Sequence, residues 1–156
     1  MDTALDMTID IQPARAGDVA GLATLVEQYW HFEAIERFDP ARMRRLLKRL
    51  VDQPALGRAW LARVNGEPAG YLVAVFVFSL EYQGLTAEID EFFVLPQHRR
   101  LGVGKRLLAQ AEASFRETGC TCVFLQIGRD NAAARAFYRG HGFCDRAGFE
   151  LVDKRL

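Results

Sequence analysis

The residues with the clearest chemical potential lie in the segment Gln97–Lys105. Gly102 and Gly104 would let the main chain approach a bulky anion closely, because glycine has no side chain in the way. If a helix begins here, its first turn adds unpaired N–H groups and the positive end of the helix dipole. Three basic residues surround the same place: Arg99, Arg100 and Lys105. These types and spacings suit a pyrophosphate group.

Two well-known phosphate-binding turns do not match this segment. A P-loop needs a glycine where Arg99 stands and a Ser or Thr where Arg106 stands. The dinucleotide-binding fingerprint needs a glycine where Leu107 stands. An ordinary helix start that contains glycine remains open, since short glycine patterns are weak signals.

The elements that must position this turn follow from hydrophobic periodicity and turn residues. Asn65-Gly66 predicts a hairpin turn, and Asp39-Pro40 predicts a helix start. Expected strands are Thr8–Gln12, Trp60–Val64, Gly70–Phe78, Glu88–Val94 and Cys120–Ile127, and Phe143–Arg146 with Phe149–Arg155 form a closing hairpin. Asp18 is the expected N-cap of a first helix, whose apolar stripe is Leu22, Leu25, Val26 and Tyr29. Asp39 is the expected N-cap of a second helix, with the stripe Met43, Leu46, Leu47 and Leu50. Two further helices are expected over Val103–Thr118 and Asn131–Arg139. This order predicts an α+β or mixed α/β fold with a single sheet.

Composition limits the class of protein. The chain has 156 residues, half of them hydrophobic, which suits a single domain over 1–156 with its own core. A formal net charge of zero argues against a globally basic nucleic-acid binder. The longest apolar run, Ala69–Leu80, is too short to span a membrane, and the residues from Met1 lack a signal-peptide pattern. The three cysteines have neither disulfide-framework nor metal-ligand spacing, so we expect free thiols and no metal site. Because free thiols are typical of a reducing compartment, we expect a cytoplasmic protein.

A second segment, Asn131–Phe143, makes the first one more specific. The first motif is Arg99-x-x-Gly102-x-Gly104 on a strand–turn–helix, and the second is Asn131, Ala136-Phe137-Tyr138 and Gly142-Phe143. With both motifs in this order, the chain resembles the GNAT superfamily of acyl-CoA N-acyltransferases. The resemblance covers about Ile9 to Val152. It implies one mostly antiparallel sheet, splayed at its fourth and fifth strands and flanked by about four helices.

The resemblance also implies a co-substrate and its binding residues. Acetyl-CoA would be the acyl donor, and no metal would be needed. The CoA pyrophosphate would lie on main-chain N–H groups of Arg100, Leu101, Gly102, Val103, Gly104 and Lys105. The pantetheine arm would pair with the main chain of Phe93 and Val94 and contact Asn131, and Arg139 would face the adenosine phosphate.

Transfer of an acetyl group to an amine needs a base and an acid. Tyr138 would protonate the departing thiolate, as the family motif implies, although a Phe-Tyr pair also suits a core. Asp90 and Glu91, followed by Glu88, are the candidate bases, and each is also a candidate for a solvated strand residue. Glu88 and Asp90 would share a face of a regular strand, and a bulge would break that alternation.

The acceptor is expected to be a small amine, because the segments around Tyr82 and Asp90 loosely resemble the diamine acetyltransferase branch. Aromatic and polar side chains at Tyr29, Trp30, His31 and Tyr82 would line its binding site. A protein N-terminal or lysine acetyltransferase is the alternative within the enzyme class, and a non-catalytic acyl-CoA-binding regulatory module is the alternative outside it. Neither a nucleic acid nor a membrane is expected as a partner, and family members often form homodimers.

Overall fold

The computed structural model describes residues 7–156. Their contacts divide into two compact units, one that ends at Leu125 and one that covers residues 126–156. The expectation of no signal peptide rests partly on residues 1–6, which lie outside the described part. No helix within residues 7–156 is both long enough and apolar enough to cross a membrane.

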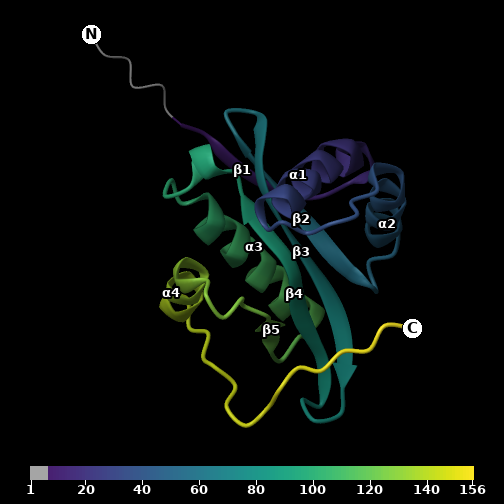
Figure 1. Ribbon diagram of the computed structural model, residues 1–156, viewed down its shortest axis with the longest axis vertical. Coiled ribbons are helices and arrows are strands. Elements are labelled where there is room, and N and C mark those ends of the chain that lie inside the picture. Colours follow the sequence, from purple (N-terminus) through teal and green to yellow (C-terminus); the bar gives the residue numbers. More distant parts are fainter. Residues whose placement is uncertain (1–6) are drawn as a thin grey trace. The chain divides into compact units, whose positions relative to one another are not determined.

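The first unit is built on one five-stranded sheet, with its strands in chain order (Figure 1). The strands are β1 (Ile9–Pro13), β2 (Gly57–Val64), β3 (Glu67–Ser79), β4 (Gly84–Val94) and β5 (Val123–Leu125). All neighbours pair antiparallel except β4 and β5, which are parallel. The predicted mixed fold with a mostly antiparallel sheet is therefore confirmed.

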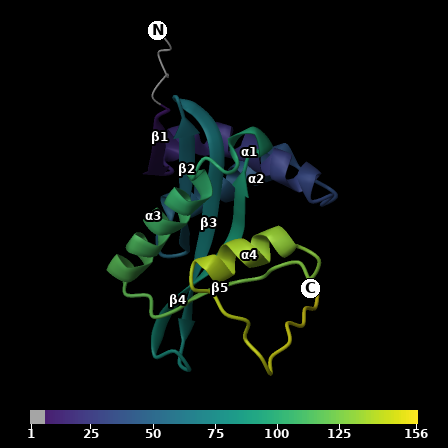
Figure 2. The same cartoon turned by 90° about the vertical axis from the view of Figure 1, so that its left-hand side faces the viewer.

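Helices cover both faces of this sheet, as Figure 2 shows. They are α1 (Val19–Phe32), α2 (Pro40–Asp52) and α3 (Val103–Thr118), with short 3-10 helices η1 (Ala16–Asp18) and η2 (Pro96–His98). On the α1 and α2 face, Leu22 and Leu25 of α1 pack with Tyr71 and Val73 of β3. On the α3 face, the ring of Phe115 packs edge-on against Trp60 at 5.6 Å. Alternate residues of β2 and β3 thus serve two separate apolar layers.

Local sequence signals account for most of the element ends. The Asp39 carboxylate accepts from the Arg42 N–H at 3.0 Å and caps α2, and Pro40 is the first residue of that helix. Asn65 and Gly66 both have positive φ angles, 51° and 85°, as the predicted hairpin turn requires. Asp18 differs from the prediction, because its carboxylate does not cap α1. It accepts instead from the Arg15 N–H at 2.8 Å and from Arg63 at 2.6 Å.

Two predicted details of the first unit are wrong. Leu46 belongs to the predicted apolar stripe of α2 but is 49% exposed, whereas Leu47 is buried and Met43 and Leu50 pack against the same core. Consecutive residues of a helix point about 100° apart, so Leu46 and Leu47 do not face the core together. The predicted strand Cys120–Ile127 is reduced to β5, three residues long. The Thr121 N–H donates to the Leu85 carbonyl, and the Cys122 carbonyl accepts from the Ala87 N–H, so main-chain bonding to β4 continues before β5 begins.

The second unit contains one helix, α4 (Ala132–Gly140). Asn131 caps it by accepting from the Ala134 N–H at 3.0 Å. The predicted closing hairpin is not formed, and residues 141–156 contain no strand. Its apolar side chains remain exposed, Phe149 by 65%, Leu151 by 72% and Val152 by 85%. A hairpin without a buried apolar face is marginally stable, which accounts for the difference.

Candidate active site

The turn between β4 and α3 has the features of an anion site. Gly102 lies just before α3 with a φ of +85°, and a Cβ added there would meet nothing within 4 Å. The first helical hydrogen bond runs from the Arg106 N–H to the Gly102 carbonyl at 3.1 Å. The N–H groups of Val103, Gly104 and Lys105 therefore have no acceptor within the helix. Open space beside several helix N–H donors fits the pyrophosphate of CoA.

The side chains of this turn point in different directions. Leu101, Arg100 and Lys105 are exposed, whereas Val103 is buried and anchors the helix start. Arg99 folds back toward the end of β4, where its Nε donates to the Val94 carbonyl at 2.9 Å. Its guanidinium also lies 4.7 Å from the centre of the Phe32 ring. Arg99 thus links the end of α1 to the end of β4 in this structure.

The main-chain groups of β4 alternate in direction. The Leu95 N–H donates to the Ala69 carbonyl at 2.8 Å, toward β3, and the Phe93 carbonyl lies close to Gly70 of β3. By alternation, the main-chain groups of Val94 face the opposite edge. Pairing with β5 ends at Ile89 and Leu125, so β4 and β5 separate before Val94. Of the two predicted pantetheine-pairing residues, this geometry favours Val94 over Phe93.

A β-bulge lies where β4 and β5 separate. Val73 of β3 pairs with Glu91, and the next residue, Ala74, pairs with Ile89, so Asp90 is the extra residue on β4. Glu91 and Glu88 consequently lie opposite Val73 and Val75, which share one face of β3. The bulge thus places Glu88 and Glu91, rather than Glu88 and Asp90, on the face that α1 and α2 cover.

Glu91 is held by two neutral donors. The Trp30 indole N–H donates to Oε1 and the Tyr71 hydroxyl donates to Oε2, each at 2.8 Å. Burial raises the pKa of Glu91, and the two hydrogen bonds oppose that rise. Burial also raises the pKa of Tyr71, and the adjacent Glu91 charge raises it further.

Asp90 is exposed at the bulge, unlike Glu91. Partial burial of its carboxyl, followed by the charge of Glu88, raises the pKa of Asp90. Its charge in turn adds to the rise in the pKa of Tyr29 to about 12, of which burial is the main cause. Asp90 therefore combines solvent access with a raised proton affinity, which are the properties of a general base.

The structure groups two of the four predicted acceptor-site residues near these acids. Tyr29 packs at 5.5 Å from the Phe93 ring, and Trp30 reaches Glu91 directly. His31 is exposed on α1 and its Nδ1 lies 2.8 Å from the Glu27 carbonyl. Tyr82 lies in the loop beyond Ser79. Ser79 is about 20 Å along β3 from Val73, the residue that pairs with Glu91. Tyr82 packs there against Phe124 of β5, away from Trp30.

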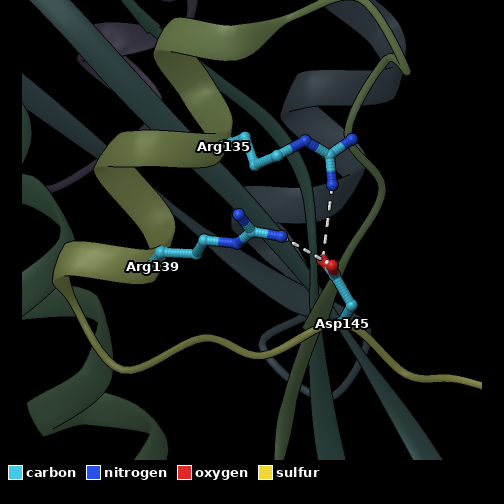
Figure 3. Close-up of polar contacts among 3 residues, drawn as sticks. All are labelled: Arg135, Arg139 and Asp145. Carbon is cyan, nitrogen blue, oxygen red and sulfur yellow. Dashed lines mark hydrogen bonds and ion pairs between the residues drawn. The ribbon is translucent and has the colours of Figure 1, made fainter.

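The second unit holds the other predicted residues. The Tyr138 ring packs edge-on against Phe137 and Phe143, with 5.3 Å between centres in each case. Arg139 donates to Asp145 at 2.8 Å, and Arg135 reaches the same carboxylate at 3.3 Å (Figure 3). Arg139 therefore lies one helical turn from a second guanidinium, and both share a single negative charge.

Sequence reasoning missed Tyr71 and Asp145. Tyr71 lies in the apolar run of β3, where nothing distinguishes a core tyrosine from one that holds a carboxylate. Asp145 lies in a segment predicted as a hairpin strand. The i, i+4 spacing of Arg135 and Arg139 was the available signal for a shared acidic partner.

Comparison with known proteins assigns the family. The acetyltransferase (GNAT) family matches residues 17–143. The uncharacterized N-acetyltransferase YhfO of Bacillus subtilis is 28% identical over 148 residues, which are 90% of this chain and 93% of YhfO. The aminoalkylphosphonate N-acetyltransferase of Salmonella typhimurium is 34% identical over 83 residues, 53% of this chain and 54% of that protein.

Solved structures show the same fold. The aminoglycoside N-acetyltransferase AAC(6')-Iy, in complex with CoA, superposes with a TM-score of 0.84 at 17% identity. The match covers 99% of this chain and all of that one (100%). The chain belongs to the GNAT acetyltransferase family. It is an acetyl-CoA-dependent N-acetyltransferase, as the resemblance in its two motifs predicted.

Proposed function

We propose that this acetyltransferase transfers the acetyl group of acetyl-CoA to the primary amine of a small, cationic molecule, by direct attack in a ternary complex. The observation that carries the proposal is the pair of acids at the β4 bulge, Asp90 and Glu91, beside the aromatic residues of α1. Carboxylates and aromatic faces together attract ammonium groups. A relative named for an aminoalkylphosphonate and a structural neighbour named for aminoglycosides are in keeping with a small amine.

The turn before α3 would hold the co-substrate. Main-chain N–H groups from Arg100 to Lys105 would bind the pyrophosphate. The outward-facing N–H of Val94, whose carbonyl already accepts from Arg99, would pair with the pantetheine arm. Asn131, as predicted from the family motif, would contact the same arm. Acetyl-CoA would supply an electrophilic thioester carbonyl and a thiolate leaving group.

Asp90 would act as the general base. It would take a proton from the acceptor ammonium, directly or through one water, and free the nitrogen lone pair. The nitrogen then bonds to the acetyl carbonyl carbon as the C–S bond breaks, and Tyr138 would give its phenolic proton to the thiolate. The second proton lost by the nitrogen, as the amide forms, would restore the Tyr138 phenol through water. Both oxygens of Glu91 are already engaged by Trp30 and Tyr71, which favours Asp90 over Glu91 for the proton transfer.

A screen of acceptors tests this proposal. CoA release from acetyl-CoA is measured with alkyl diamines, amino sugars, aminophosphonates, and peptides with a free N-terminus or a lysine. We expect the highest kcat/KM with a small cationic amine. Activity on peptides alone would favour the protein acetyltransferase alternative. Tight CoA binding without release for any amine would favour the regulatory module.

A further inference from the structure

The two donors to Glu91 come from elements that are far apart in the sequence. Trp30 lies on α1 and Tyr71 on β3. The Trp30 Nε1 and the Tyr71 hydroxyl oxygen each lie 2.8 Å from the Glu91 oxygen to which they donate. Both donors are neutral, so they stabilise the carboxylate without cancelling its charge. Each carboxylate oxygen also keeps a second lone pair, which can accept a hydrogen bond from a cation.

Apart from these two donors, the layer around Glu91 is largely apolar. Tyr71 belongs to the apolar layer that also contains Val73 and Phe93, and Trp30 packs edge-on against Phe38 at 5.4 Å. A half-buried carboxylate in such a layer costs free energy unless donors compensate it. The structure supplies two donors for this one anion, which indicates that the negative charge itself is used.

We propose that Trp30 and Tyr71 are positioning residues that keep Glu91 ionised and fixed, so that Glu91 binds the acceptor as an ammonium beside Asp90. The inference rests on the proposed function, because it concerns the amine side of the same site. Asp90 and Glu91 then have separate tasks: Glu91 binds the cation, and Asp90 takes its proton.

The ionisable groups around Glu91 set the direction of the pH effect. On β4 and β3 they are Asp90 and Tyr71, and on α1 the adjacent residue is Tyr29, with Glu33 beyond it; Glu88 acts on Asp90. One cation, Arg99, lies on this face, with its guanidinium over the Phe32 and Phe93 rings and its Nε donating to the Val94 carbonyl. The remaining groups are acidic or neutral. Because hydrogen bonds to the carboxylate lower its pKa, removing one donor must raise that pKa further.

Tyr71→Phe and Trp30→Phe each remove one donor and keep an aromatic ring. With an alkyl diamine as acceptor, kcat/KM is followed from about pH 5 to about pH 9, where the amine is still largely protonated. We expect the acidic limb to move up by about one pH unit in each variant. The KM for the diamine should rise by up to about tenfold at the acidic end of the range, where Glu91 is largely protonated in both parent and variant, and should return toward the parent value as pH increases. The kcat should stay within about threefold.

Two further variants make the result specific. Glu91→Gln should raise the KM most at high pH and remove the part of its pH dependence that Glu91 contributes, because no carboxylate remains to ionise. Trp60→Phe is the matched tryptophan loss on the α3 face, and it should lower thermal stability without moving the acidic limb. A loss in Tyr71→Phe and Trp30→Phe that is equal at all pH values, or an unchanged profile, would overturn the inference.

A readout independent of turnover separates this inference from the proposed function. In protein labelled with 13C at glutamate carboxyls, the Glu91 signal, assigned by its loss in Glu91→Gln, reports the pKa directly. An upward shift in Tyr71→Phe and Trp30→Phe is expected even without an acceptor. If the parent protein acetylates no small amine, the proposed function fails, while an unmoved carboxylate titration would sink the positioning role alone.

Discussion

Gly102 combines a left-handed backbone with open space at the predicted pyrophosphate position. Gly102→Val would place a branched side chain in that space and strain a φ of +85°. We expect loss of measurable CoA binding by calorimetry in a variant that still folds. Near-normal CoA affinity would contradict the proposed backbone cradle.

Gly119 provides the matched control for that variant. It ends the same helix with a φ of +87° and is also open around its Cα. Gly119→Val therefore introduces comparable strain at the opposite end of α3. It should lower stability by an amount comparable to Gly102→Val and leave CoA affinity unchanged.

Tyr138 has a proposed role that its ring contacts alone do not require. Its contacts with Phe137 and Phe143 within the second unit are those of a packed ring, and Tyr138→Phe would keep them. If the hydroxyl protonates the thiolate, turnover should fall about 10²-fold or more while the Kd for CoA stays within about twofold. Steady-state kinetics with calorimetry measure both quantities. Unchanged turnover would remove Tyr138 as the acid.

At the scale of elements, α4 presents two guanidinium groups to one carboxylate (Figure 3). Both ion pairs are partly exposed, so each contributes little to stability. Asp145→Asn would leave Arg135 and Arg139 without their shared counter-ion. If Arg139 faces the adenosine phosphate, CoA affinity should rise severalfold at low salt, and Arg139→Gln should reduce it.

Dephospho-CoA provides the control for the α4 prediction. It lacks the phosphate on the adenosine ribose, so its affinity should change little in either variant. Equal effects on CoA and dephospho-CoA would show that Arg139 acts elsewhere. The comparison is made by calorimetry at two salt concentrations, because electrostatic effects should weaken as salt increases.

The elements also show what the sequence could and could not predict. Periodicity and capping residues located α3 at Val103–Thr118 and predicted the cap of α2, because those signals are local. A bulge on β4 was considered from the sequence, but its position at Asp90 depends on pairing with β3. The closing hairpin failed for the same reason, since strand pairing is decided by distant partners.

At the scale of the whole chain, two separated motifs are enough to predict the family. The candidate site was only partly predictable. The turn at Gly102 is a local feature, whereas the bonds from Trp30 and Tyr71 to Glu91 join three elements across the sheet. We propose that residues 1–156 act as one catalytic domain, although their contacts form two compact units.

The central claim is that Asp90 removes the proton from a small amine that attacks acetyl-CoA directly. The most direct test is the pH dependence of CoA release by Asp90→Asn, with the best acceptor from the screen and saturating acetyl-CoA. We predict a fall in kcat of about 10²-fold or more, loss of the acidic limb that Asp90 contributes, and unchanged CoA affinity. An Asp90→Asn variant with parental kcat and an unaltered pH profile would contradict the account.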